Sequence, residues 1–266
     1  MNERRWCSDG IKRMGGAALI ACLCVGSALA ARAQAPADIS RVNGSIRIAA
    51  GETSGDVSTV NGSIRIEDGA TAQDVDTVNG SIVLGPRAVV QRVESVNGGI
   101  TLGEAARAAS IETTNGALKL GPKAQVEGGV EAVNGSITLE RDARVAGRVS
   151  NVNGRMELAA AHVSGGLRTT TGDITVGPGA RVEGGIRVDK PTASWFRLVK
   201  PRPRIVIAPN AVVQGTLHFE HEVDLYVSDR ARIGPVEGTT PIRYSGEKPH
   251  RAARSPGNRA PGDRGT

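Results

Sequence analysis

The chain has 266 residues, of which 33 are basic and 27 acidic, with only two each of Trp, Tyr and Phe. Aromatic side chains supply much of the buried area of ordinary globular cores, so this composition excludes a thick core of that kind. Hydrophobic residues make up 39% of the chain and recur in register, which argues against disorder. The composition therefore predicts a thin, regular structure filled by Ile, Val, Leu and Ala.

Residues 1–33 have the pattern of a bacterial secretory signal peptide. Basic residues within the first thirteen positions precede a charge-free run at 14–30, and small residues suit cleavage after Ala33 or Ala30. The run is slightly short for an uncleaved anchor. Residues 19–22 resemble a lipoprotein cleavage box, but the apolar run continues past them. We expect an exported protein, located in the periplasm or at the surface of a bacterium.

Cleavage would change the chemistry of the mature chain. All three cysteines, Cys7, Cys22 and Cys24, lie in the signal region, so no disulfide or thiolate metal site would remain. Residues 1–33 hold five basic and two acidic groups, which lowers the net charge from +6 to +3. The tail at 246–266, also with five basic and two acidic groups, carries that remainder. The nearly neutral body gives no reason to expect a nucleic-acid partner.

One motif, Val-Asn-Gly-Ser-Ile-Arg-Ile, starts at Val42 and recurs every 18 or 19 residues. Apolar residues fall in pairs two apart, as one face of a strand requires: Ile82 with Leu84, then Ala88 with Val90. A third inward position is expected at Val96, Thr114, Val133 and Val152.

Three short strands per repeat describe a coil with three sides. A single coil cannot bury its apolar edge, so successive coils must stack in parallel register. We therefore predict an all-β fold: a single-stranded, three-sided parallel β-helix (β-solenoid) of about ten 18-residue coils, spanning residues 34–245.

Each repeat carries an Asn-Gly pair where the coil must bend. Glycine at a bend is typical of a backbone with positive φ, and asparagine tolerates the same region. In a stack, the asparagines would form a ladder of amide hydrogen bonds. The predicted turn ladder consists of Asn43, Asn61, Asn79, Asn97, Asn115, Asn134 and Asn153 with Gly44, Gly62, Gly80, Gly98, Gly116, Gly135 and Gly154.

The repeat is interrupted at residues 190–204, which contain three prolines, five basic residues and no acidic residue. Because apolar pairs resume at Ile205, we expect an insertion between coils. Its two aromatic rings either enter an anionic lipid or envelope glycan surface or fold back over apolar strands. The tail at 246–266 is expected to be disordered. The candidate interaction loop offers Lys190, Trp195, Phe196, Arg197, Lys200, Arg202 and Arg204.

The half-repeat LGPKAQVEGGV at 120–130, seen again at 207–217, resembles polymer-forming β-helices of the bactofilin type. The Asn-Gly-x-Ile half resembles bacterial adhesin-type β-solenoids of unknown function. Together the two resemblances cover roughly residues 40–235. The first implies a protein that forms filaments without a nucleotide. Most bactofilins are cytoplasmic, whereas this chain has an export signal. The hexad at 84–89 also resembles left-handed hexapeptide acyltransferases, so the handedness of the coil stays open.

Few side chains are placed for catalysis. His162 is expected to be exposed. His218 and His221 are a candidate loose metal site, although alternation with Leu217 and Phe219 favours a charged outer face of a strand. Outward residues of the Asn-Gly strands are too mixed for a carboxylate row that cleaves polysaccharide. We therefore expect no enzymatic activity and no cofactor.

Three classes of function follow from these observations. The first is a structural or polymer-forming scaffold of the cell envelope, and the second is a surface adhesin or a rod that binds glycan or lipid. A remote third is a polysaccharide-acting or hexapeptide-type acyltransfer enzyme. The first coil starts at residues 39–42 with no helix to cover it, and an open sheet edge carries unpaired N–H and C=O groups. We therefore expect self-association through coil ends.

Overall fold

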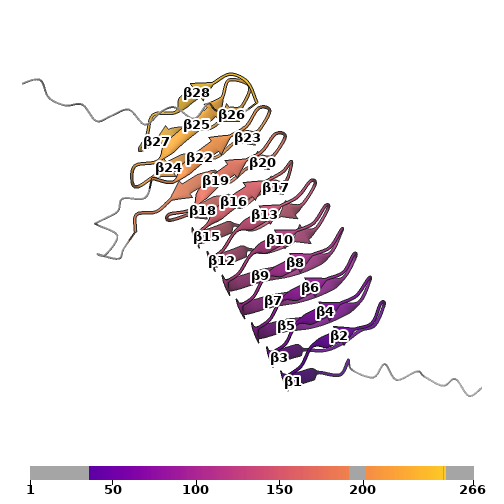
Figure 1. Cartoon of the computed structure of the whole chain (residues 1–266). Helices are drawn as coiled ribbons and strands as arrows, with labels where there is room; N and C mark the ends of the chain where they lie inside the picture. The colour runs from indigo at the N-terminus through magenta and orange to yellow at the C-terminus, as the bar shows by residue number, and fades with distance from the viewer. Residues whose placement is uncertain (1–35, 192–201, 248, 250–266) are drawn as a thin grey trace, which may run out of the picture. The chain divides into compact units, whose positions relative to one another are not determined.

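A computed structural model describes residues 36–191, 202–247 and 249. They belong to one compact unit that starts at Ala35. Within these ranges the chain forms strands joined by turns, and no helix there could cross a membrane. The strands stack in successive turns from β1 to β28 (Figure 1). The predicted β-solenoid is confirmed, while the expected signal peptide and most of the expected tail lie outside the described residues.

The first sheet contains one strand from each coil and follows the Asn-Gly corner. Its 11 parallel strands show that the stack has about 11 coils. Register partners are 18 or 19 residues apart over most of the stack, as for Ile46 with Ile64 and Leu118 with Ile137. The strands are β2 (Ile46–Ile48), β4 (Ile64–Ile66), β6 (Ile82–Leu84), β8 (Ile100–Leu102), β10 (Leu118–Leu120), β13 (Ile137–Leu139), β16 (Arg155–Leu158), β19 (Asp173–Val176), β22 (Arg204–Ile207), β25 (Asp224–Ser228) and β28 (Ile242–Tyr244).

The second sheet has 17 strands and combines the two remaining sides of the coil. One side is formed by β11 (Gln125–Val126), β14 (Arg144–Val145), β17 (His162–Val163), β20 (Arg181–Val182), β23 (Val212–Val213) and β26 (Arg232–Ile233). The other is formed by β1 (Ile39–Asn43), β3 (Val57–Asn61), β12 (Val130–Asn134), β15 (Val149–Asn153), β18 (Leu167–Thr169), β21 (Ile186–Val188), β24 (Leu217–Phe219) and β27 (Val236–Glu237). Both sides are continuous in β5 (Thr71–Asn79), β7 (Val89–Asn97) and β9 (Arg107–Asn115).

Glycine divides these two sides in the later coils. From β11 onward the two strands of a coil are separated by glycine-containing bends, where Gly166 and Gly185 have φ angles of 88° and 81°. Glycine adopts this left-handed region without a steric penalty. The expected three separate strands per coil therefore describe the C-terminal coils, whereas β5, β7 and β9 are longer than predicted.

Aliphatic side chains from all sides fill the interior. The predicted pairs Ile82 with Leu84 and Ala88 with Val90 are at most 2% exposed. The third inward position was predicted wrongly: Val96 and its counterparts Val133 and Val152 are 41–44% exposed, and Thr114 is exposed as well. The last inward residue lies two positions before the corner Asn, so the residue next to the Asn points outward.

A row of small polar side chains takes that last inward position. Thr77 donates from Oγ1 to the carbonyl oxygen of Gly62 at 3.1 Å, and Thr113 donates to that of Gly98 at 3.3 Å. Each bond links a coil to the corner of the preceding coil. Buried hydroxyls therefore have partners and contribute to stacking instead of weakening the core.

Candidate functional site: the charge row and the base of the insertion

The seven asparagines of the turn form an exposed ladder along the stack. From Asn61 onward, each Nδ2 donates to the Oδ1 of the Asn one coil earlier, at 2.9–3.1 Å. Thr171 continues the ladder by donating to Oδ1 of Asn153. Because these amides bond to each other and not to groups in a cavity, the arrangement is structural.

The corner glycines are required for a different reason from the predicted one. Of the seven, Gly44 and Gly154 have positive φ, at 112° and 134°, and the others do not. A Cβ on Gly98 would instead overlap the carbonyl oxygen of Gly80 in the preceding coil. Close backbone stacking, and not a left-handed conformation, thus selects glycine at Gly98 and its neighbours in the row.

Outward side chains on the third side of the coil are ordered by charge. We call them the charge row: each lies three residues before the corner position, and register pairs each with the next. Four carboxylates are followed by a serine and then by three basic side chains. The row reads Asp76, Glu94, Glu112, Glu131, Ser150, Arg168, Arg187 and His218.

The acidic half of the row brings like charges together. Glu112 and Glu131 form no ion pair with a described residue, while Glu94 lies 3.5 Å from Nε of Arg92. Burial, and then the charge of Glu94, raises the pKa of Asp76. Like charges directly opposite one another weaken a sheet, so this half carries an electrostatic penalty within the molecule.

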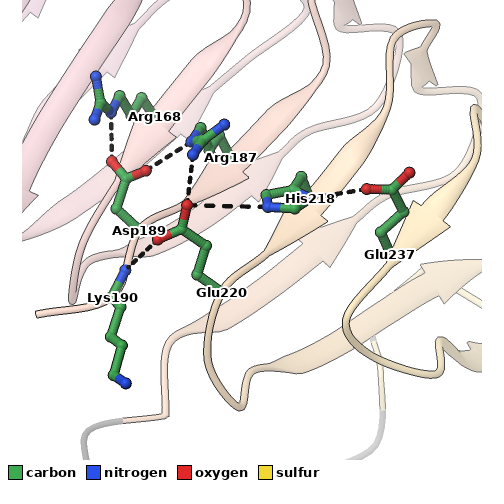
Figure 2. Close-up of polar contacts among 7 residues, drawn as sticks. All are labelled: Arg168, Arg187, Asp189, Lys190, His218, Glu220 and Glu237. Carbon is green, nitrogen blue, oxygen red and sulfur yellow. Dashed lines mark hydrogen bonds and ion pairs between the residues drawn. The ribbon is translucent and has the colours of Figure 1, made fainter.

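The basic half is tied into a network of alternating charges (Figure 2). Arg168 and Arg187 both donate to the carboxylate of Asp189, and Arg187 also donates to Glu220. Burial raises the pKa of Asp189, but the hydrogen bonds from the two arginines outweigh it and the pKa is lowered. The backbone N–H of Lys190 donates to Glu220 at 3.1 Å and lowers the pKa of that carboxyl.

Valines flank the acidic half. Val78, Val96, Val133 and Val152 lie two residues after members of the charge row and are 39–44% exposed. A hollow of about 270 Å³ lies between the two halves and is lined by Glu131, Val133, Arg148, Val152 and Arg168 among others. This side of the solenoid thus combines ordered charge with exposed apolar surface.

A second hollow, of about 440 Å³, lies beside the basic half. It is lined by the glycine bends at Gly165, Gly166 and Gly184 and by Arg168 and Arg187, among others. A side chain at Gly184 would meet the backbone of Gly165 in the preceding coil, so the hollow is a consequence of stacking.

The base of the insertion is anchored to neighbouring coils. Arg202 lies 2.7 Å from Glu222, and the N–H of Arg204 donates to Oδ1 of Asp173 at 2.8 Å. Arg204 is the first residue of β22, with its guanidinium 5.0 Å from the ring centroid of Tyr226, so the insertion ends before it. Arg204 therefore does not belong to the candidate interaction loop. Trp195, Phe196, Arg197 and Lys200 lie outside the described residues.

The histidines have separate environments. His162, expected to be exposed, is half-buried with Nε2 3.0 Å from Glu183, and this contact lowers the pKa of Glu183. His218 points outward with Nδ1 2.8 Å from Glu237, whereas burial lowers the pKa of His221. The described residues contain no group of three His, Cys, Asp or Glu side chains that could hold a metal ion.

These features define a parallel β-solenoid with an ordered charged side. No family model matches the chain, and no match was found among the curated proteins or the solved structures. The structure therefore shows the β-solenoid fold that the resemblances imply. Membership of either family is not shown.

Proposed function

We propose that the protein is a non-enzymatic scaffold of the bacterial cell envelope whose subunits join through the first coil. The observation that carries this proposal is an open edge: among the described strands, β1 pairs with β3 and β2 with β4, on one side only. The outer edge of this coil keeps the register of the repeat. Such an edge is a template for another strand.

The two ends of the described stack differ. Near the C-terminal end, β26 and β27 have two residues each, and β28 pairs with β25 so that Ile242 faces the outward residue Tyr226. Ile242 is consequently 49% exposed. A one-residue change of register reverses which side chains face the core, so this end does not continue the repeat. Joining through two first coils favours a closed, two-fold pair of solenoids over an open filament.

Export is the second part of the proposal and rests on the sequence. A basic segment, an apolar run and small residues at Ala30 and Ala33 support signal-peptide cleavage. Expression of the full chain in a Gram-negative host, followed by mass spectrometry of the periplasmic and medium fractions, should give a mature protein that starts at Ala31 or Gln34. Recovery of the uncleaved chain in the cytoplasm would contradict export.

The end contact can be tested with a proline at the open edge. The N–H of Ile39 donates inward to Asp56 at 2.7 Å, so the N–H of its neighbour Ser40 faces the open side. In the chain from residue 34 onward, Ser40→Pro removes one edge donor and should reduce the dimer seen by light scattering while the melting temperature stays near wild type. Proline is tolerated at an edge strand.

Ser58→Pro is the matched control, because β3 is paired on both sides, with β1 and β5. It should destabilise the fold instead of selectively reducing assembly. A wild-type chain that stays monomeric at high concentration would refute the end contact, as would a Ser40→Pro variant that associates as well as wild type.

A second candidate function, a rod that binds anionic lipid or an acidic glycan, is favoured by the anchored base of the insertion. Arg202 forms an ion pair with Glu222, and the backbone N–H of Lys190 donates to Glu220, so both ends of the insertion contact the turn between β24 and β25. Changing both Trp195 and Phe196 to Ser should abolish sedimentation with phosphatidylglycerol vesicles at low salt and leave the melting temperature unchanged. Loss of stability without any wild-type binding would instead show that the rings cover strands.

A further inference from the structure

The charge row is self-complementary about its central serine. Counted in coils from Ser150, Glu131 lies one coil away on one side and Arg168 one coil away on the other. At two coils the residues are Glu112 and Arg187. At three coils they are Glu94 and His218. Each of these three carboxylates thus has a basic side chain at the same distance on the opposite side of Ser150, whereas at four coils Asp76 lies opposite Glu237.

We propose that this side of the solenoid binds a second copy of the chain in antiparallel orientation. A two-fold axis parallel to β15 and passing at Ser150 reverses the order of the coils but keeps each position along the strand. Glu131 then faces Arg168 of the second copy, and Glu112 faces its Arg187. Every such contact occurs twice.

Arg168 can accept this contact although it already has an internal partner. Arg168 contacts Asp189 through Nε, and its two Nη groups form no hydrogen bond to a described residue. The contact with Asp189 therefore fixes the guanidinium and leaves its outer edge for a carboxylate, which arginine binds through two parallel N–H groups. On the acidic side, Glu112 and Glu131 would exchange mutual repulsion for attraction.

Shape and apolar surface favour the same pairing. Val152 would meet Val152 of the second copy near the axis, and Val133 would lie close to it. Beside the row, Gly166 would face Gly129 of the second copy, so small residues allow the two backbones to approach. Arg148 would lie near its own counterpart, but its long side chain lines the same hollow as Glu131 and can turn toward it.

This lateral contact is independent of the contact between first coils, because Ser150 lies six coils from Ser40 in the same register. Failure of one therefore leaves the other testable. A pair of narrow, charged sides is typical of a weak, salt-sensitive association.

Cysteine cross-linking tests the position of the axis. The chain from residue 34 onward has no cysteine, so Ser150→Cys introduces one thiol close to its own copy in the dimer. We expect rapid formation of a disulfide-linked dimer under mild oxidation at low salt. Ser58→Cys, at the same register position but five coils away, is the matched control and should cross-link far more slowly. Equal rates for the two variants would overturn the proposal.

Charge exchange tests the pairing itself. In the Ser40→Pro background, which weakens the contact between first coils, Glu131→Arg alone should weaken dimerisation at low salt roughly tenfold or more, because it places arginine against Arg168 of the second copy twice per dimer. Arg168→Glu alone should do the same. An equimolar mixture of the two variants restores both contacts in a heterodimer and should associate as tightly as wild type. Glu157→Arg, on the first sheet, should leave dimerisation unchanged.

Circular dichroism and melting curves show whether Arg168→Glu, which loses the contact with Asp189, still folds. If it does not, Glu131→Arg and the Ser150→Cys comparison decide the matter. A folded pair of charge variants that fails to form the heterodimer overturns the proposal, as does a Glu131→Arg variant that dimerises like wild type.

Discussion

At Gly98 the carbonyl oxygen of Gly80, one coil earlier, occupies the space that a Cβ would need. The φ angle of Gly98 lies outside the left-handed region, so the requirement for glycine is steric. We predict that Gly98→Ala and Gly98→Asn destabilise the protein to a similar extent, by about 1–3 kcal/mol, since either Cβ forces two coils apart. Urea unfolding followed by circular dichroism measures the difference.

Gly69 supplies the control for this prediction. Its φ is 64° and nothing lies within 4 Å of the position of its Cβ. Gly69→Asn should cost much less than Gly98→Asn, because Asn tolerates a left-handed backbone. If Gly98→Asn is as stable as wild type, stacking is not what selects glycine at the corner.

Another bend of the coil does require a left-handed backbone, and several coils place a residue with a side chain there. Arg87, Ala105 and Lys123 have φ angles of 55–59°. For such a residue the left-handed region costs roughly 1–2 kcal/mol, and glycine would lose roughly 0.5–1 kcal/mol in chain entropy. We therefore predict that Ala105→Gly stabilises the protein by up to about 1 kcal/mol in the same assay. The adjacent Ala106→Gly removes a buried methyl and should destabilise it; equal losses for both variants would contradict this reasoning.

Among the strands, the ionic network across β18, β21 and β24 makes stability depend on pH. The lowered pKa values of Asp189 and Glu220 mean that folding favours their charged forms. This contribution is present above the unfolded pKa of about 4 and is lost as the pH falls through the lower folded values. Arg187→Gln should therefore lower the melting temperature at pH 7, by roughly 1–4 °C, and make less difference at pH 3.

Arg65→Gln is the control, because Arg65 lies outward on the first sheet and forms no ion pair with a described residue. It should change the melting temperature little at either pH. A difference between Arg187→Gln and wild type that is the same at pH 7 and pH 3 would show that the network does not stabilise the protein through these carboxylates.

The strand pattern shows how far the sequence could predict the structure. Alternation of apolar residues correctly predicted the inward pairs of the first sheet, such as Ile82 with Leu84, because side chains on a strand alternate strictly. The inward position on the third side was predicted wrongly, because valine occurs there at both inward and outward positions. Val93 points inward and Val96 outward, and only the geometry of the corner distinguishes them.

The charge row was missed for a related reason. Its signal is a column three residues before the corner, at Glu94, Glu112 and Glu131, and a single repeat shows only one of these carboxylates. Reading down aligned repeats would have revealed the change from acidic to basic residues. The contacts of Asp189 with Arg168 and Arg187 join different coils and needed the structure.

At the scale of the whole solenoid, each coil is stabilised mainly by the coils on either side. Backbone pairing, the aliphatic interior and the Asn ladder all act between neighbours, as expected for a repeat protein. The end coils lack one neighbour among the described residues, and the first coil presents the more regular edge. This difference between the two ends is the basis of the proposed contact between first coils.

Negative-stain microscopy of the chain from residue 34 onward tests whether solenoids join through the first coil. About 11 coils spaced by roughly 4.8 Å give a stack on the order of 50 Å long. In salt high enough to suppress the lateral contact, we expect wild-type particles of about twice this length to become frequent as concentration rises. The Ser40→Pro variant should show fewer double-length particles than wild type at the same concentration. Wild-type particles of single length at every concentration would contradict the contact between first coils.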